Sequence, residues 1–323
     1  MIKLGDVTLR HGLFLAPMAG FSDRAMRLVC REQGAEYLTS EMISAKAVTY
    51  KDKKTFALCN LYEDEMPCAL QLFGSEPSVV AEAAGMLCCG FGGAVAPTAI
   101  DINMGCPVPK IVGNGEGSAL MKNPSLAYDI LRATVKASSV PVTVKIRAGF
   151  DESNKNACEL ALAAEEAGCA LVCVHGRTKT QMYSGKADRS IIADVKKSVH
   201  IPVVANGDVC DAQSCLDMIS QTGCDGVAIG RGAIGNPFVF AEITAALEGR
   251  EYTPPTQKEK IELALRQLRL AIEDKGERVA TAESRKQIAE YVKGMAGAAA
   301  VRACVNAATS YEQIEQILYS VVS

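Results

Sequence analysis

The chain has 323 residues, of which 49% are hydrophobic and 22% are charged, and its formal net charge at pH 7 is −3. These values are typical of a globular protein with an ample core, and the charge argues against indiscriminate binding to nucleic acid or membranes. No apolar run approaches the roughly 18 residues of a membrane span, and the apolar segment 12–17 is too short for a signal peptide. We therefore expect a cytoplasmic protein with no membrane association.

Thirteen cysteines stand beside only three histidines. No two cysteines have the spacing Cys-x-x-Cys. Because thiols stay reduced in the cytosol, the sequence predicts no disulfide framework. The few histidines and the missing Cys-x-x-Cys spacing argue against a zinc or iron–sulfur site. We expect no bound metal, and we place most of the thiols among the small residues of the core.

Short apolar runs recur along the first two thirds of the chain, and each is expected to form a strand. Amphipathic, Ala-rich stretches between them predict helices. The predicted strands are 13–16, 37–40, 69–73, 98–102, 142–146, 171–175, 202–205 and 226–229. The predicted helices include 78–87, 126–137, 157–167, 189–198 and 210–221.

Strands that alternate with helices predict a parallel sheet, and eight such units predict a closed (β/α)8 TIM barrel, an α/β fold. Polar residues follow the ends of the runs, and in this barrel the carboxyl ends of the strands form one mouth where active sites lie. A doubly wound sheet is the alternative, but it would not gather so many polar strand ends in one place. The residues at these ends are Met18, Glu41, Gln71, Asn103, Lys145, His175, Asn206 and Arg231.

The pattern changes after Pro237, where strand candidates give way to helical periodicity. We predict a barrel domain over residues 1–242 and a small all-helical C-terminal domain over residues 243–323. The expected linker is 250–256, and the helical patterns of the tail cover 261–272, 287–292 and 311–322.

The most informative motif reads Asp-Ile-Asn-Met-Gly-Cys-Pro-Val-Pro-Lys over residues 101–110. Glycine and two prolines after a strand make a stiff loop, so the side chains of Asn103 and Cys106 are held in place. An asparagine amide pairs with a donor and an acceptor on a planar ring, and a thiol can donate a proton. The pair suits chemistry on a small heterocycle, with a buried structural cysteine in a turn as the alternative.

Two glycine-containing turns, 206–208 and 230–232, follow the last two predicted strands. They expose backbone N–H groups, and Arg231 adds a cation, at the place where this fold usually binds phosphate. A structural tight turn is the alternative. Residues 230–235 also fit the dinucleotide pattern G-x-G-x-x-G, but this match is weak because no second βαβ unit with a ribose-binding acid follows it.

Gln71, Lys145 and His175 end three further strands and converge on the same mouth. Alone, such a lysine forms a Schiff base, binds an anion or makes a structural ion pair, and a lone histidine is more often structural than catalytic. Opposite a phosphate site, the three suit a planar ring with carbonyls and ring nitrogens, and flavin mononucleotide (FMN) has that shape and one phosphate. The segment Ala16-Pro-Met-Ala-Gly20 supplies small, apolar backbone on which the ring can lie.

Taken in order, these motifs resemble those of the tRNA-dihydrouridine synthases, with the bacterial B-type as the nearest match. The resemblance runs from about residue 1 to 305 and includes 284–294 in the tail. One departure is Arg189, where relatives often carry Trp, and it bears on local packing or tRNA contact rather than on the chemistry. The matching motifs are Ala16-Pro-Met-Ala-Gly20, Gln71-Leu-Phe-Gly74, Asp101-Ile-Asn-Met-Gly-Cys-Pro107, Val144-Lys-Ile-Arg147, Val174-His-Gly-Arg-Thr178, Asn206-Gly-Asp208 and Gly230-Arg231.

The resemblance implies an FMN-dependent enzyme that reduces the C5–C6 double bond of specific uridines in the D-loop of tRNA, with NADPH or NADH as reductant. Hydride from the reduced flavin N5 would go to uracil C6, and Cys106 would donate a proton to C5. An ordinary thiol, with a pKa of about 8.5, is mostly protonated at neutral pH. Asn103 and Arg177 would bind the substrate. The implied flavin ligands are Pro17, Met18 and Ala19 as a cradle, Gln71, Lys145 and His175 around the ring, and Asn206, Gly207, Asp208, Gly230 and Arg231 at the phosphate.

The macromolecular substrate leaves a fainter signal in the tail. Near its middle, Arg285, Lys286, Lys293 and Arg302 face only Glu290. Lys286 and Lys293 share a helical face, so these residues form a candidate phosphate-contacting patch, with a merely solvated charged face as the alternative. The resemblance favours tRNA contacts for Lys286 and Arg302. A uracil stacked in folded RNA must be extruded to reach a barrel mouth.

Two other functions stay open at this point. A flavin barrel acting on a free pyrimidine, of the dihydroorotate or dihydropyrimidine dehydrogenase type, would share an Asn-x-x-Cys-Pro-like loop but would not need the helical tail. A non-enzymatic RNA-binding protein would need neither Cys106 nor a complete flavin set. By analogy with the family, we expect a monomer.

Overall fold

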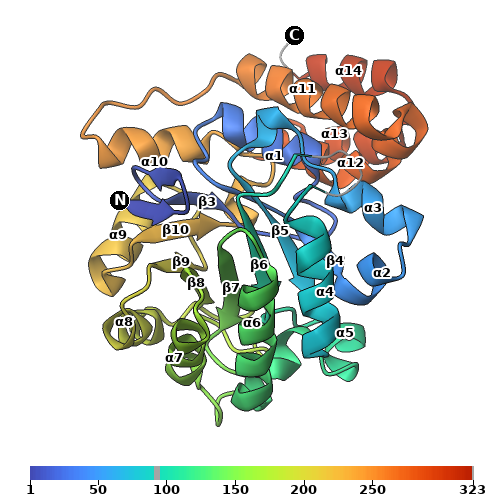
Figure 1. The fold of residues 1–323 in the computed structure, drawn as a ribbon. Helices are drawn as coiled ribbons and strands as arrows, with labels where there is room; N and C mark the ends of the chain where they lie inside the picture. Colours follow the sequence, from blue (N-terminus) through green and yellow to red (C-terminus); the bar gives the residue numbers. More distant parts are fainter. Residues whose placement is uncertain (91–94, 322–323) are drawn as a thin grey trace.

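The computed structural model describes residues 1–90 and 95–321. Eight parallel strands form a ring enclosed by helices (Figure 1). They are β3 (Leu13–Leu15), β4 (Leu38–Ser44), β5 (Cys68–Phe73), β6 (Ala99–Asn103), β7 (Val142–Arg147), β8 (Leu171–His175), β9 (Val203–Asn206) and β10 (Gly226–Ile229). All of the predicted strands are present, and only β4 runs well past its expected end.

Hydrogen bonding runs around the ring in the order β3-β10-β9-β8-β7-β6-β5-β4. The ring closes between β3 and β4 through a parallel bridge from Phe14 to Tyr37, where Leu15 N donates to Tyr37 O and Tyr37 N donates to Leu13 O. The predicted TIM barrel is therefore confirmed, and the alternative of a doubly wound sheet is excluded. The carboxyl ends of the eight strands share one mouth.

An N-terminal hairpin, β1 (Ile2–Leu4) paired with β2 (Val7–Leu9), was not apparent from the sequence. Its strands are too short for their alternation to stand out. Ile2, Leu4 and Leu9 are buried and pack into the cluster of side chains that fills the barrel interior. A Cβ at Gly226, the first residue of β10, would lie 2.9 Å from the Ile2 side chain. The hairpin therefore closes the end of the barrel opposite the mouth.

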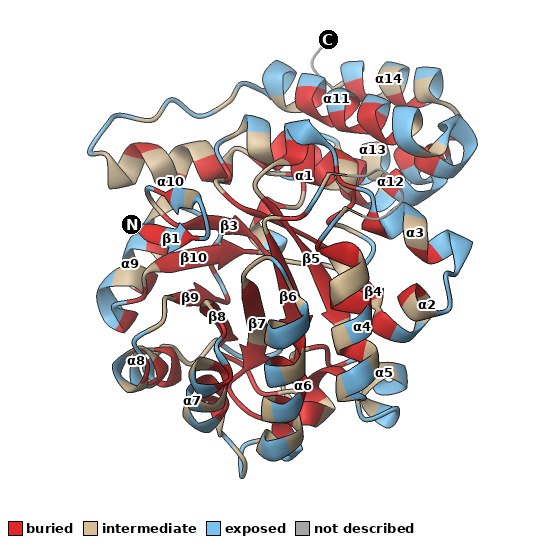
Figure 2. Ribbon diagram, in the orientation of Figure 1, coloured by how far each residue is buried: buried red, intermediate tan, exposed pale blue. Residues whose placement is uncertain are grey.

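Helices cover the outer surface of the barrel, with exposed residues on their solvent side (Figure 2). Helix α6 (Pro124–Ala137) begins after Asn123, whose side chain accepts a hydrogen bond from Leu126 N, as short polar side chains do at helix starts. The helices that match predicted ones are α6 (Pro124–Ala137), α4 (Pro77–Leu87), α7 (Ala157–Ala167), α8 (Arg189–Ser198) and α9 (Ala212–Thr222). Those not predicted are α1 (Arg24–Glu32), α2 (Ala45–Thr49), α3 (Lys53–Cys59) and α5 (Pro109–Gly113).

The C-terminal tail is helical, as predicted. Its first helix begins with a capping box in which the side chains of Thr256 and Glu259 bond each other's backbone N–H groups. The helices are α11 (Gln257–Lys275), α12 (Glu277–Tyr291), α13 (Ala298–Ala307) and α14 (Tyr311–Tyr319). Val322, the end of the last predicted helix, lies outside the described residues. Within those residues, no helix has the length and apolar character to cross a membrane.

Helix α10 (Val239–Leu247) packs against α9 and spans the expected domain boundary at 242/243. The division into residues 1–242 and 243–323 stays a prediction. The structure shows only that α10, the last helix of the barrel, runs five residues past that boundary, to Leu247.

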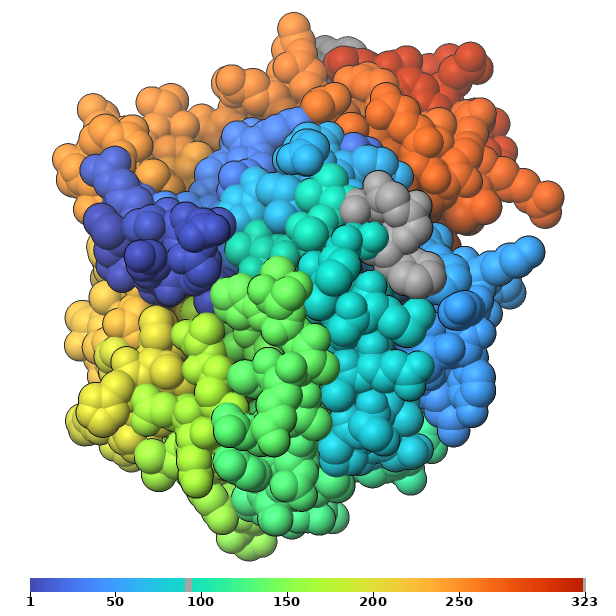
Figure 3. Space-filling view, viewed as in Figure 1, coloured from blue at the N-terminus to red at the C-terminus, as the bar shows by residue number. Residues whose placement is uncertain are grey.

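The tail lies directly against the barrel (Figure 3), with α11 packed on α1. Arg266 of α11 forms an ion pair with Glu32 of α1 at 2.7 Å. A Cβ at Gly235, just beyond β10, would come within 2.6 Å of the Glu290 carbonyl carbon and 2.8 Å of Tyr291 N. The backbone of α12 therefore rests on a bare glycine of the barrel, and the last glycine of the G-x-G-x-x-G match serves this contact.

Candidate active site at the mouth of the barrel

Asn103 ends β6, and its side chain holds the loop that carries Cys106. Asn103 Oδ1 accepts hydrogen bonds from the backbone N–H groups of Cys106 at 2.9 Å and of Gly105 at 3.1 Å. Burial raises the pKa of the Cys106 thiol, against the opposing effects of a hydrogen bond with the Val108 backbone and the charge of Arg147. The thiol is therefore protonated at neutral pH and fixed to a strand end.

A buried chain of hydrogen bonds joins β5, β6 and β7 below this loop. Asn103 Nδ2 donates to Gln71 Oε1 at 2.7 Å, and Gln71 Nε2 donates to Asp101 Oδ2 at 2.7 Å. Thr143 Oγ1 donates to the other Asp101 oxygen at 2.6 Å. Asp101 accepts from both neighbours, so it orients the Gln71 amide, and Gln71 in turn orients the Asn103 amide.

Lys145 of β7 lies between these amides and the glycine turns. Its Nζ donates to Asn206 Oδ1 at 3.0 Å, and Asn206 Nδ2 donates to the Ala228 carbonyl at 2.7 Å. Burial lowers the pKa of Lys145. The bond to Asn206 is its one hydrogen bond among the described residues, so the ammonium group keeps donors for a ligand. Asn206, expected at the phosphate, thus also links β7 to β10.

His175 ends β8 and lies beside Arg177, whose Nη1 is 3.4 Å from His175 Nε2. Arg177 Nη2 donates to both oxygens of Asp208 at 2.7 and 2.8 Å, and the guanidinium also bonds the carbonyls of Ser184 and Gly185. Burial and the surrounding cations lower the pKa of His175 far below its ordinary value, so the ring is neutral. Arg177 is only 2% exposed. Its partners are internal, so in this arrangement it positions Asp208 instead of facing a substrate.

The turns after β9 and β10 lie side by side, as expected for a phosphate site. Arg231 Nη2 is 3.7 Å from Asp208 Oδ1, and the guanidinium lies 4.9 Å from the Tyr183 ring centroid. The Arg231 side chain is 55% exposed, so it keeps donors for an anion. Gly207 has φ 129°, which side chains rarely adopt, and a Cβ there would come within 2.6 Å of the Ala187 Cβ. This turn requires glycine.

Pro17, Met18 and Ala19 follow β3 on the other side of the same opening. Met18 N donates to Ser22 Oγ at 2.9 Å, which fixes the turn. A Cβ at Gly230 would lie 3.5 Å from Met18 Sδ, so the missing side chain leaves backbone accessible next to Met18. With the free donors of Lys145 and the exposed Arg231, this cradle fits a flat ring that carries a phosphate.

Arg147, the last residue of β7, has no role that the sequence predicts, and it lies between two loops of the mouth. Its Nε donates to Gly105 O at 2.6 Å, and its Nη1 donates to the carbonyls of Thr178 at 2.9 Å and Met182 at 3.0 Å. Arg147 therefore ties the cysteine loop to the loop after β8. Strand alternation puts it on the same face as Lys145, two residues earlier, and that signal was available in the sequence.

The two tail residues predicted to bind tRNA have different surroundings. Lys286 Nζ lies 4.4 Å from the Phe21 ring centroid, and a Cβ at Gly20 would come within 2.8 Å of it. Arg302 Nη1 is 3.8 Å from Glu290 Oε1, and its side chain is 42% exposed. Lys286 therefore borders the mouth, whereas Arg302 belongs to the outer surface of the tail.

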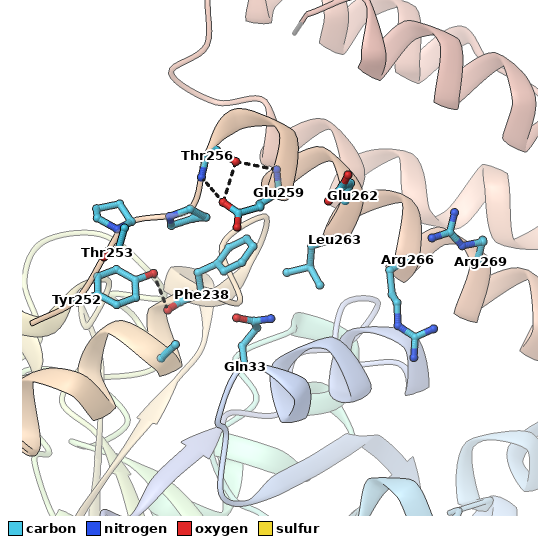
Figure 4. A pocket seen from close by; sticks show the side chains of 13 residues that line it. Gln33, Phe238, Tyr252, Thr253, Thr256, Glu259, Glu262, Leu263, Arg266 and Arg269 are labelled. Carbon is cyan, nitrogen blue, oxygen red and sulfur yellow. Dashed lines mark hydrogen bonds between the residues drawn. The ribbon is translucent and has the colours of Figure 1, made fainter. Parts of the chain in front are cut away.

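A hollow of about 720 Å³ lies at the linker, between the end of α1 and the start of α11 (Figure 4). Gln33, Phe238, Tyr252 and Leu263 are among its lining residues. Gln33 ends a helix that runs back from the mouth, so the hollow is on the opposite side of the barrel. No residue predicted for catalysis or cofactor binding lines it, and we assign the chemistry to the mouth.

A family model described as dihydrouridine synthase (Dus) matches residues 14–321. The chain belongs to this family. The family consists of oxidoreductases, so the chain is an enzyme, and the resemblance inferred from its motifs is confirmed. The flavin, the reductant and the role of each site residue are not part of this finding.

The relatives are similar over nearly their whole length. A probable tRNA-dihydrouridine synthase of Rickettsia conorii is 39% identical over 308 residues, which cover 95% of this chain and 92% of the relative. The tRNA-dihydrouridine synthase B of Pseudomonas aeruginosa is 38% identical over 308 residues, with 95% and 91% covered. The similar proteins thus include a synthase of the B-type, the type that the motifs resemble.

Among solved structures, histamine dehydrogenase from Rhizobium sp. 4-9 superposes with a TM-score of 0.56 at 13% identity. The match covers 77% of this chain and 47% of that chain, so this chain corresponds to about half of the larger protein. At this identity the similarity shows the barrel fold alone.

Proposed function

We propose that this dihydrouridine synthase reduces the C5–C6 double bond of specific uridines in the D-loop of tRNA, with FMN as cofactor and NADPH or NADH as reductant. The observation that carries the proposal is a buried, protonated Cys106 thiol on a fixed loop that shares one mouth with Lys145 and the glycine turns. Membership of the family, and relatives named for tRNA, support it.

When bound and reduced, FMN supplies the hydride that goes to C6 of the uracil. Lys145 keeps free donors and Arg231 stays half exposed, so both can bind the cofactor without breaking the contacts described above. The residues proposed to hold FMN are Pro17, Met18, Ala19, Gln71, Lys145 and His175 for the ring, and Asn206, Gly207, Asp208, Gly230 and Arg231 for the phosphate.

Cys106 is the proposed acid. Hydride addition at C6 leaves negative charge on the uracil towards C5 and O4, and the thiol S–H bond breaks as the C5–H bond forms. The thiolate then takes a proton from solvent. Burial disfavours the thiolate, which keeps the proton in place until it is needed, and Arg147 offers a positive charge near the sulfur once the proton has left.

Asn103 and Arg177 are proposed to serve the substrate in different ways. Asn103 lies at the mouth at the end of β6, and its amide orients the Cys106 loop against which the uracil is proposed to bind. Arg177 acts indirectly, because its contacts fix Asp208 and the loop after β8. The tail, with Lys286 and Arg302, is proposed to bind the tRNA backbone while the target uridine is extruded into the mouth.

The test is mass-spectrometric detection of dihydrouridine after the flavin-loaded protein is mixed with NADPH and tRNA that lacks the modification. Product at a D-loop position is the expected result. A parallel reaction with free uracil, uridine and orotate tests the pyrimidine alternative. A yellow, NADPH-reducible protein that reduces a free pyrimidine but not tRNA would overturn the proposal.

A further inference from the structure

A cleft of about 530 Å³ lies where the helical tail meets the mouth of the barrel. The loops after β3 and β4 form one wall, and α11 and α12 form the other; Figure 1 shows α3 beside α12 at this place. Gly20, which directly follows the proposed flavin cradle, and Lys286 both line the cleft. The cleft therefore adjoins the reaction site but is separate from it.

Most of the charged side chains that line the cleft form ion pairs. Lys275 of α11 lies 2.8 Å from Asp23 of the barrel and 2.9 Å from Glu283 of α12. Arg24 pairs with Asp64 at 2.9 Å and covers one face of the Tyr62 ring, 4.3 Å from its centroid. These contacts hold the two walls in place and leave few charges available to a ligand.

The charges that are available have opposite signs. In the described part of the chain, Lys286 makes no ion pair with a carboxylate, and Glu41 and Asp274 make none with a cation. The pairing of β4 with β5 shifts register between Thr39 and Met42, and this irregularity places Glu41 at the mouth. Glu41 Oε1 accepts one hydrogen bond, from Gly20 N, and Glu41 Oε2 accepts none from the described residues, so each oxygen keeps a lone pair that can accept from a ligand.

Gln287 adds a buried donor to the same cleft. It is 2% exposed, and its Oε1 accepts a hydrogen bond from Gln267 Nε2 at 2.7 Å. Gln287 lines the cleft, and its Nε2 makes no hydrogen bond with the described residues, so this amide group can donate to a ligand there. Tyr62, 43% exposed, supplies an aromatic ring. The cleft thus offers a cation, a carboxylate, an amide donor and a stacking surface.

We propose that this cleft binds a second, unpaired nucleotide of the tRNA, next to the uridine that is reduced, and that its base is a guanine. Lys286 matches the phosphate, and Tyr62 offers a ring for stacking. Guanine is the one standard base that presents two adjacent N–H donors, N1–H and N2–H2, to a single carboxylate, which Glu41 supplies.

The inference rests on the proposed function, because it assigns the cleft to the same RNA. The tail supplies Lys286, Gln287 and Asp274, and a reductase of small molecules has no need of such a tail. RNA is therefore favoured over the reductant as the occupant. If so, the enzyme recognises the target uridine by contacts in the mouth and by the neighbouring guanine, which the cleft binds.

The test compares Glu41→Gln and Tyr62→Ala with the same substitutions at two exposed residues, Glu63→Gln and Tyr50→Ala, which do not line the cleft. Equilibrium binding of unmodified tRNA is measured by titration, without turnover. Loss of one stacked or bidentate base contact is expected to weaken binding roughly tenfold in both cleft variants. The control variants are expected to bind as the wild type does. Tyr62→Ala changes an exposed side chain and serves if Glu41→Gln fails to fold.

The base is tested with tRNA transcripts in which inosine, which lacks the N2 amino group, replaces one D-loop guanosine at a time. One substitution should weaken binding to the wild type and have no further effect on Glu41→Gln. Unchanged tRNA binding by both cleft variants would overturn the proposal. So would slower flavin reduction by NADPH in these variants with tRNA binding intact. Because binding is measured without turnover, failure of dihydrouridine formation in the wild type remains a separate result.

Discussion

Asn103 Oδ1 and the backbone N–H of Cys106 are joined by a hydrogen bond of 2.9 Å. The position of the thiol therefore depends on a side chain at the end of β6. Through the hydrogen bonds of Asp101 it also depends on Gln71 of β5 and Thr143 of β7, the strands at either side. A proton donor works only within hydrogen-bond reach of the atom that receives the proton. In the proposed reaction the amide and the thiol thus act together, and only the thiol gives up a proton.

Cys106→Ala is expected to keep its flavin and its reduction by NADPH but to lose at least about 100-fold in the rate of dihydrouridine formation, because the general acid is gone. Asn103→Ala keeps the thiol but removes the hydrogen bonds that hold its loop, so we expect a reaction that is slower but not abolished. Single-turnover reaction of reduced enzyme with unmodified tRNA measures both. Cys89→Ala, an exposed thiol after the end of α4, is the control. Normal product from Cys106→Ala would refute the assignment.

The proposed acid also predicts a pH dependence. Cys106 must be protonated to act, so the rate of tRNA reduction is constant below its pKa and falls tenfold per pH unit above it. Burial raises this pKa, so the fall should begin above the ordinary thiol pKa of about 8.5. Arg147→Met removes a charge that lowers the pKa and should move the fall to higher pH, whereas Arg147→Lys should not. A fall centred below pH 8 in the wild type would contradict the assignment.

Arg231→Ala is expected to weaken FMN binding about 10- to 100-fold, the effect of losing a charged hydrogen bond worth about 1.5–3 kcal/mol. Fluorescence titration of flavin-free protein with FMN measures the change. Arg250→Ala is a matched control, because the side chain of Arg250 is 58% exposed and that of Arg231 is 55% exposed. Equal affinities in the two variants would remove Arg231 from the phosphate site.

Gly235→Ala is expected to destabilise the docking of the tail. Gly235 and Gly249 both have positive φ, at 66° and 64°, but only Gly235 faces a neighbour at 2.6 Å. Gly249→Ala therefore measures the backbone strain alone, about 1–2 kcal/mol, and Gly235→Ala should cost about 1–3 kcal/mol more because of overpacking. Urea unfolding followed by circular dichroism compares them. An equal loss of stability would show that α12 yields freely.

Arg302→Ala is expected to weaken tRNA binding without changing flavin content. If Arg302 contacts one phosphate, the slope of log affinity against log salt should fall by about one. Lys258→Ala, outside the patch of residues 284–302, is the control. A slope equal to that of the wild type would assign Arg302 to its ion pair with Glu290 instead.

Much of the barrel was predictable because a polar residue lies at or just beyond the end of each apolar strand and so marks the mouth. Gln71, Asn103, Lys145 and His175 were placed at the mouth from strand ends alone, and the structure brings them together there. What the sequence could not reveal is partnership. Asn206 bonds Lys145, an inference that needs the register of β7 and β9 around the ring.

The contacts of Arg177 were likewise not predictable from the sequence. Its motif was visible, but burial at 2% exposure and a bidentate bond to Asp208 come from the fold of the loop after β8. The cleft beside Glu41 also lay beyond the reach of the sequence, because its walls are far apart along the chain. Glu41 was noted at a strand end, and Lys286 in the tail, without a reason to connect them.

The hairpin of β1 and β2 closes one end of the barrel with Ile2, Leu4 and Leu9. The barrel interior behind the hairpin is filled by side chains, so a ligand reaches the residues of the mouth from the mouth alone. In the proposed reaction, the nicotinamide and the uridine both need the flavin, so they must occupy that opening in turn. Excess tRNA should therefore slow flavin reduction, and excess NADPH should slow the RNA step. In the proposed reaction the two halves would thus take place in alternation, because both ligands use the single mouth.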